Sequence, residues 1–145
     1  MAFTSTANLK TYSNNLEALS DKPGNLGALM DEVQAASPSW DVVTGTTQQA
    51  TANASYLANN GSLVTVTLPT AAAVGTMIRV AGLGAGGWRV AQNASQLVHK
   101  SGTATTTGTG GHIDSGNRYD AVTLLCVVAN TEWDIIASQG TIATT

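Results

Sequence analysis

The chain has 145 residues, of which 43% are hydrophobic and only 10% are charged, and its formal net charge is −3 at pH 7. This balance excludes a basic nucleic-acid-binding face and a highly charged disordered chain. The length suits one domain with an appendage, and it is sufficient to bury a hydrophobic core. The single cysteine, Cys126, excludes an intramolecular disulfide framework. No apolar run approaches the roughly 20 residues of a membrane-spanning helix, so we expect no membrane insertion.

Residues 1–38 carry two apolar stripes with the spacing of amphipathic helices, separated by turn-forming residues at 20–25. The stripes consist of Leu9, Tyr12, Leu16, Leu19, Leu26, Leu29, Met30 and Val33. We predict two short helices that end before Pro38. They either pack on the rest of the chain or serve as an attachment and oligomerisation segment.

Residues 39–145 have a different composition, with short β-branched or alternating runs separated by Gly and Asn. The run from Ala121 to Val128 is almost entirely apolar, which predicts a strand buried on both faces. The predicted strands cover residues 64–68, 77–81, 88–91, 121–128 and 133–137. We therefore predict a mainly β fold, with an antiparallel β-sandwich or barrel-like module at 39–145 and a short N-terminal α-helical segment.

The glycines of residues 82–87 match the G-x-G-x-x-G pattern of dinucleotide-binding proteins. That fingerprint needs a helix whose N-terminus binds the pyrophosphate, and it occurs within a βαβ unit. Here the glycines run directly into the predicted strand that begins at Trp88. We interpret them as a tight turn and predict no nucleotide cofactor.

The candidate catalytic groups are few. His112, Asp114 and Ser115 lie together in one glycine-rich stretch, where a triad with a buried carboxylate is disfavoured. For glycosidic cleavage the available carboxylates are few, and we interpret Asp120 and Asp134 as caps of turns or strand ends. We predict that the protein is not an enzyme.

The two histidines, His99 and His112, are interpreted as exposed or hydrogen-bonded side chains. Either would bind a metal only if an oligomer gathered three copies on its axis, and we predict no metal site. Cys126 lies in the middle of a predicted strand and is interpreted as an inert core thiol.

Several segments between residues 56 and 140 form a recognisable series, of which Gly-Gly-Trp-x-x-Ala-Gln-Asn at residues 86–93 is the most specific. Others are Arg118–Val122 and Asn130–Trp133. This series resembles the β-rich modules near the C-terminus of bacteriophage tail fibres and related virion appendages. The resemblance implies a non-enzymatic, homotrimeric virion protein, made in the host cytoplasm, that presents a surface to the host envelope.

On this basis we expect a tail fibre or tail-tip module that contributes to host attachment. Residues 1–38 would contact other virion tail or baseplate proteins, and the β-rich module would face outward. The alternative is a decoration or cement protein of the capsid or baseplate that binds no receptor. A polysaccharide-degrading enzyme is a third and more distant hypothesis.

Host attachment suggests a shallow glycan-binding surface, because weak contacts repeated in three copies gain effective concentration. Aromatic faces beside amides and guanidinium groups are the side chains suited to it, although each Trp fits a core position better than a ligand platform. The candidate binding residues are Trp88, Arg89, Gln92, Arg118, Tyr119 and Trp133.

Overall fold

A computed structural model describes residues 39–145, and every regular element in this range is a β-strand. The mainly β prediction is confirmed there, whereas the helices expected over residues 1–38 lie outside the described residues. The described part contains no helix that is long and apolar enough to span a membrane. The strands are β1 (Trp40–Val43), β2 (Thr47–Gln49), β3 (Ser55–Ala58), β4 (Val64–Thr67), β5 (Met77–Gly82), β6 (Trp88–Ala91), β7 (Leu97–Lys100), β8 (Thr103–Ala104), β9 (His112–Ser115), β10 (Ala121–Val128), β11 (Glu132–Gln139) and β12 (Ile142–Thr144).

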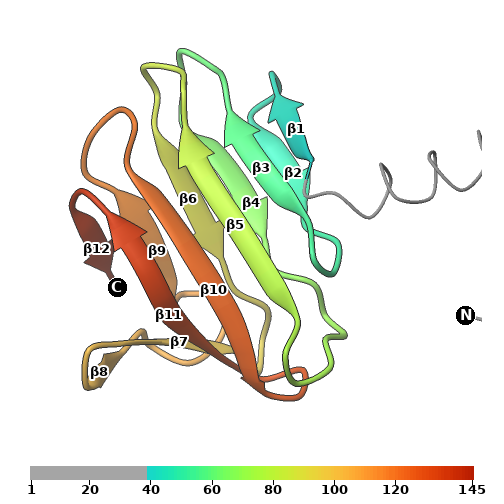
Figure 1. Cartoon of the computed structure of the whole chain (residues 1–145). Coiled ribbons are helices and arrows are strands. Elements are labelled where there is room, and N and C mark those ends of the chain that lie inside the picture. The colour runs from blue at the N-terminus through green and yellow to red at the C-terminus, as the bar shows by residue number, and fades with distance from the viewer. Residues whose placement is uncertain (1–38) are drawn as a thin grey trace, which may run out of the picture. The chain divides into compact units, whose positions relative to one another are not determined.

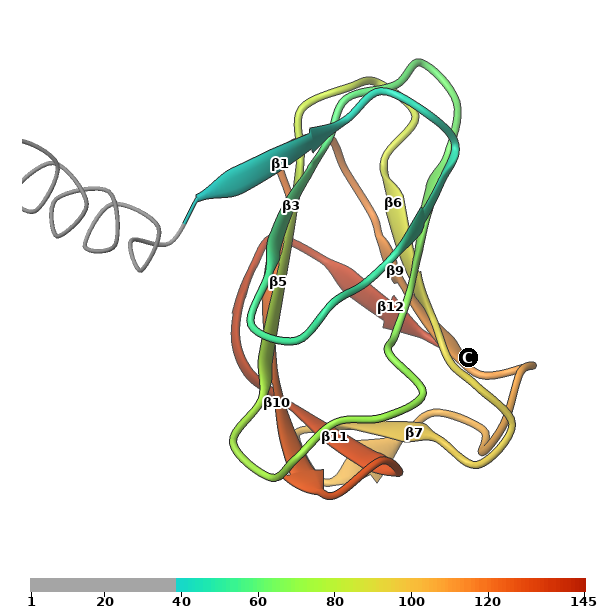
Figure 2. The same ribbon diagram turned by 90° about the vertical axis from the view of Figure 1, so that its right-hand side faces the viewer.

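The strands form two sheets that face one another (Figures 1 and 2). The seven-stranded sheet has the order β1-β3-β5-β10-β11-β7-β8, and the five-stranded sheet has the order β12-β9-β6-β4-β2. The two-layer arrangement agrees with the predicted sandwich.

The prediction of antiparallel sheets is wrong, because both sheets are mixed. The pairs β1–β3, β3–β5, β2–β4, β4–β6 and β7–β11 are parallel, and the other five are antiparallel. The reason is the path of the chain, which crosses from one sheet to the other after each of the first five strands. Each crossing reverses the direction of the chain, so the next strand added to the same sheet runs parallel to the previous one.

The core lies between the two sheets and follows from alternation along the strands, because successive side chains point to opposite faces. Val64 and Val66 of β4 are fully buried, while Thr65 and Thr67 between them are half-buried on the outer face. Trp88 and Val90 of β6 repeat the pattern opposite Ile78 of β5. The alternation of hydroxyl and apolar residues therefore places the hydroxyls on the outer face.

β10 corrects a second expectation. Only Val122, Leu124 and Cys126 are buried in this strand, whereas the intervening residues are half-buried and the last two, Val127 and Val128, are exposed. The continuous apolar run predicted burial on both faces. Within residues 39–145 only the inner face of the sheet is covered by a second layer, so the outer face of β10 is left half-exposed.

Candidate functional site

Three of the six predicted binding residues lie in the core. Trp88 and Trp133 have no exposed surface, and Gln92 is 3% exposed. Both tryptophans share the inward face of their strands with other apolar residues, Trp88 with Val90 and Trp133 with the partly buried Ile135. Their position removes these three side chains from contact with an external ligand.

Trp88 connects a loop to the core through two hydrogen bonds. Its indole Nε1 donates a hydrogen bond to the backbone carbonyl of Asp120 at 2.8 Å, and its backbone N–H donates to Ser115 Oγ at 2.9 Å. Both acceptors flank the loop of residues 116–119 that joins β9 to β10. Trp88 therefore has a structural role in positioning that loop.

Gln92 also satisfies buried backbone groups. Its Nε2 donates to the carbonyl of Gln96 at 2.6 Å, and its Oε1 accepts a bond from the Thr105 hydroxyl. Gln96 in turn donates to the carbonyls of Pro69 and Asn130 at 2.8 and 3.0 Å. Because unpaired buried polar groups are costly, this network holds three loops together rather than offering an amide to a ligand.

Arg89 lies on the outer face of the five-stranded sheet, paired with Asp114 of the neighbouring strand β9. Its Nε and Nη2 donate to the two carboxylate oxygens at 2.7 and 2.8 Å. The hydrogen bond to Asp114 raises the pKa of Arg89, opposed by partial burial. His112 Nε2 lies 3.5 Å from the same carboxylate. The guanidinium is thus already bound in a bidentate pair, the geometry it would otherwise offer to an anionic ligand.

The residues considered for a catalytic triad are separated by the sheet. His112 and Asp114 lie on the outer face of β9, and the Ser115 hydroxyl instead accepts the backbone N–H of Trp88. In the described range, no three His, Cys, Asp or Glu side chains are grouped to hold a metal ion. His99 is paired with Glu132, with its Nε2 2.8 Å from the carboxylate oxygen.

The glycines at 82–87 form the turn from β5 to β6, as the sequence predicts. A Cβ on Gly84 would lie 2.2 Å from the carbonyl oxygen of Asn60, and one on Gly86 would lie 2.1 Å from the backbone of Ser62. Glycine is required here because two backbone segments approach closely, and phosphate binding is not needed to explain it.

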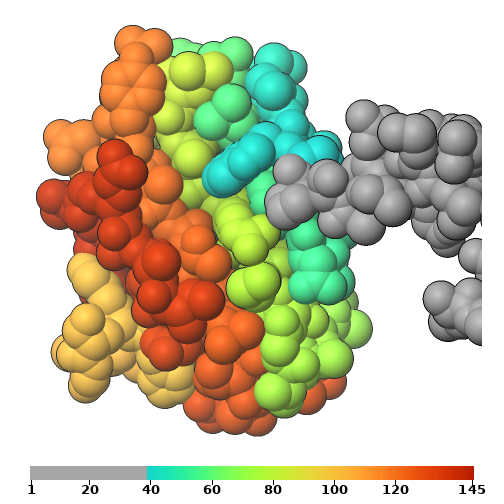
Figure 3. All heavy atoms as spheres, viewed as in Figure 1, coloured from blue at the N-terminus to red at the C-terminus, as the bar shows by residue number. Residues whose placement is uncertain are grey.

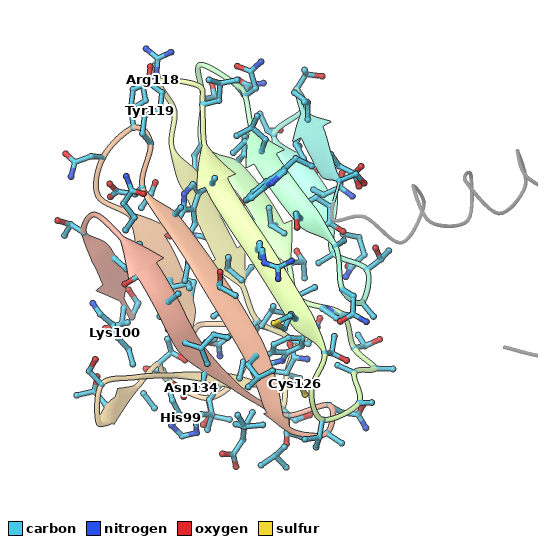
Figure 4. The ribbon with its side chains drawn as sticks, in the orientation of Figure 1. His99, Lys100, Arg118, Tyr119, Cys126 and Asp134 are labelled. Carbon is cyan, nitrogen blue, oxygen red and sulfur yellow. The ribbon has the colours of Figure 1, made fainter. Side chains whose placement is uncertain are left out.

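Arg118 and Tyr119 are the two predicted residues that the structure brings together on the surface. They lie at one end of the sandwich, remote from His99 and Asp134 at the other end (Figure 4). The Arg118 guanidinium carbon is 4.8 Å from the centre of the Tyr119 ring, and Nε donates to the carbonyl of Leu83 at 2.7 Å. Tyr119 is 57% exposed. We call this pair the Arg–Tyr tip.

Asp120 fixes the backbone of the Arg–Tyr tip. Its side chain is almost completely buried, and Oδ2 accepts the backbone N–H groups of Gly116, Asn117 and Thr141 at 2.9 to 3.1 Å. Tyr119 itself has a left-handed backbone with φ of 73°. Such a conformation is costly for a residue with a side chain and persists only where the surrounding structure enforces it.

The structure also reveals a surface that the sequence reasoning missed. A shallow groove of about 270 Å³ lies on the outer face of the seven-stranded sheet, and it includes Trp40 and Arg79. In Figure 3, which shows this face, atoms of β1 extend across β3 toward β5. We call this feature the Trp40–Arg79 groove.

The groove follows one register row across five strands. Trp40, Ser55, Arg79, Thr123 and Ala137 are successive partners in β1, β3, β5, β10 and β11. With neighbouring strands about 4.8 Å apart, this row spans about 19 Å. The only sequence signal for this groove is the alternation in β5, which places Arg79 on the outward side of the strand. The strand pairing that brings Trp40 into the same row leaves no local pattern in the sequence.

Comparison with known protein families finds no match for this chain, and comparison with curated proteins finds no relative.

Proposed function

We propose that this chain is a structural virion protein of a bacteriophage, a homotrimeric tail fibre or tail-tip module that contributes to host attachment. The resemblance of residues 56–140 to phage appendage modules supports the assignment to a virion. In this role the chain is not an enzyme and requires no cofactor, and its 39–145 module presents a binding surface to the host.

The Arg–Tyr tip is the observation that carries the attachment role. Arg118 and Tyr119 offer a guanidinium and an aromatic face at one end of the sandwich, and three backbone hydrogen bonds to Asp120 hold their loop. Preorganised loops lose little conformational entropy on binding. The Nε of Arg118 is bonded to Leu83, which fixes the side chain while the terminal nitrogens remain available for an acidic glycan.

Homotrimer formation would raise the avidity of such a small site. A two-residue tip buries too little surface to bind tightly alone, but three linked copies convert later binding events into intramolecular ones. We assign self-association and contact with other tail or baseplate proteins to residues 1–38, whose sequence carries two apolar stripes.

The first test locates the protein and measures its mass. Labelling of intact particles should place the protein on the tail, and solution mass measurement of the full chain should give a trimer. A capsid location together with absence of cell binding would replace the proposal with the decoration or cement alternative.

The second test addresses the tip. Binding of the full chain to host cells should fall at least about tenfold in the Arg118→Gln/Tyr119→Ala double variant, because each of three copies loses a charge-assisted contact. Thr47→Ala, an exposed change on the five-stranded sheet, is the control and should bind as the unmodified chain does. Equal binding by the double variant would remove the tip from the attachment surface.

A further inference from the structure

We propose that the Trp40–Arg79 groove is a separate binding site for a carboxylate-bearing pyranose, a single acidic sugar unit. The groove lies on the outer face of the seven-stranded sheet, whereas the Arg–Tyr tip lies in the loop between β9 and β10. This inference goes beyond the proposed function, since the groove would bind such a sugar wherever the protein resides.

Arg79 provides the charge complementarity. It is half-buried in the middle of the register row, between Ser55 and Thr123, and no described carboxylate lies within ion-pair distance. None of the described residues that line the groove is acidic. A partly desolvated guanidinium without a partner is suited to a carboxylate, which it binds through two parallel hydrogen bonds. Arg89, by contrast, already has this arrangement with Asp114.

Trp40 provides the aromatic surface. It is 46% exposed although it is among the largest apolar side chains of the described residues, and it lies one strand from Ser55, which is only 2% exposed although it belongs to the outer face. The burial of Ser55 indicates that the neighbouring larger side chains cover it. An indole held over a sheet in this way presents a flat apolar face, against which the C–H groups of a pyranose pack.

The remaining lining residues fit one sugar ring. Ala121 and Ala137 have short side chains, which leave the space between Trp40 and β11 open. Thr123 and Gln139 add a hydroxyl and an amide that can bond to sugar hydroxyls. The volume of about 270 Å³ lies just below the range of roughly 300–1,000 Å³ that is typical of ligand sites. A single unit of a longer glycan therefore fits better than an extended segment.

A second copy of this face is a poorer occupant. Two such faces packed together would bury Arg79 without a carboxylate, because no acidic residue of the 39–145 range lines the groove. A buried charge without a partner is strongly unfavourable. The same cation favours a small anionic ligand.

The test is a titration of the full, ¹⁵N-labelled chain with the methyl glycosides of glucuronate and glucose, which differ only in the carboxylate. The chain has three tryptophans, and Trp88 and Trp133 are fully buried. Glucuronide should therefore shift the indole resonance of Trp40 and leave the other two in place. The neutral glucoside should bind at least about tenfold more weakly than the glucuronide.

Variants separate the contributions. Arg79→Gln should reduce glucuronide affinity to that of the glucoside, and Trp40→Ala should weaken both sugars. Lys100→Gln, which removes one positive charge outside the groove lining and outside the Arg–Tyr tip, is the control and should leave the titration unchanged. The unshifted indole resonances of Trp88 and Trp133 report that each variant is folded.

Three results would overturn the proposal: glucuronide binding that is unaffected by Arg79→Gln, equal binding of the two glycosides, or displacement of glucuronide by acetate at equal concentration. Self-association that disappears in Trp40→Ala would assign the face to a contact between copies instead. Particle location and the cell binding of the Arg118→Gln/Tyr119→Ala variant are measured separately, so failure of the groove and failure of the proposed function are distinguishable.

Discussion

The backbone carbonyl of Asp120 accepts a hydrogen bond from the indole N–H of Trp88 at 2.8 Å. A fully buried tryptophan is thus bonded to the residue whose side chain holds the exposed loop of residues 116–119. The carboxylate of Asp120 accepts three backbone N–H groups, from Gly116, Asn117 and Thr141. A buried side chain from the five-stranded sheet thereby controls the geometry of the Arg–Tyr tip.

The first prediction concerns this carboxylate. Asp120→Ala should lower the free energy of unfolding by about 3 kcal/mol, because it leaves three backbone donors without their acceptor. Asp120→Asn should cost less, since its amide oxygen can still accept. Denaturant unfolding measures both. Asp41→Asn, at an exposed carboxylate, should change stability by no more than about 0.5 kcal/mol, and an equally small effect of Asp120→Ala would contradict the assigned role.

The second prediction separates backbone strain from steric clash. Gly140 and Gly102 have nearly the same φ, 84° and 83°, but a Cβ at Gly140 would lie 1.9 Å from Asp120 Oδ1 whereas Gly102 has open space. Gly102→Ala should cost about 1 kcal/mol, and Gly140→Ala should cost about 2 kcal/mol more. Equal losses in thermal or denaturant unfolding would show that the loop moves aside without penalty.

The third prediction concerns the strained backbone of Tyr119. Tyr119→Gly should be more stable than Tyr119→Ala by about 1 kcal/mol, because glycine adopts positive φ without steric cost. At Thr107, an exposed loop residue without positive φ, the order should reverse, with alanine the more stable replacement. If alanine is the more stable replacement at both positions, the backbone of Tyr119 is not strained.

The fourth prediction is a pH dependence. Burial raises the pKa of the Cys126 thiol, with a smaller opposing effect of a backbone hydrogen bond from Asn130. The unfolded thiol ionises near pH 8.5, so the stabilisation it confers is complete below that pH and is lost as pH rises toward the folded pKa. By pH 10 the unmodified chain should have lost up to about 2 kcal/mol relative to Cys126→Ala.

Unfolding free energies of both chains at pH 7.5, 9 and 10 test this. The comparison with Cys126→Ala removes the contribution of other groups that titrate in the same range. A difference that does not change with pH would mean that the folded thiol ionises as readily as the unfolded one.

Local pattern was sufficient to predict five of the twelve strands of residues 39–145, β4, β5, β6, β10 and β11. The alternating Val64–Thr67 and the β-branched residues around Ile78 define their elements by themselves, and both form strands with the expected side inward. The same alternation could have placed Trp88, which shares a face with Val90, in the core. Its residue type made Trp88 a candidate for stacking against a sugar, but its place on the inward face of β6 buries it in the core.

Strand partnership could not be predicted in the same way. The pairing of Trp40 with Ser55 and of Ser55 with Arg79 depends on crossings between sheets, and nothing within β1, β3 or β5 encodes it. The Trp40–Arg79 groove is a product of that pairing, which is why the two residues were not recognised together. Arg118 and Tyr119 were recognisable because they are neighbours in the chain.

The alternating path has a consequence for how this module can vary. Trp40 and Ser55 are fifteen positions apart and Ser55 and Arg79 are twenty-four apart, yet both pairs are adjacent partners in the same sheet. Each time the chain passes from one sheet to the other and back, it adds one strand to each sheet, and the connections between these strands differ in length. New sequence can be inserted at the ends of the sandwich without altering strand register, so surface loops can diversify while the two sheets are preserved.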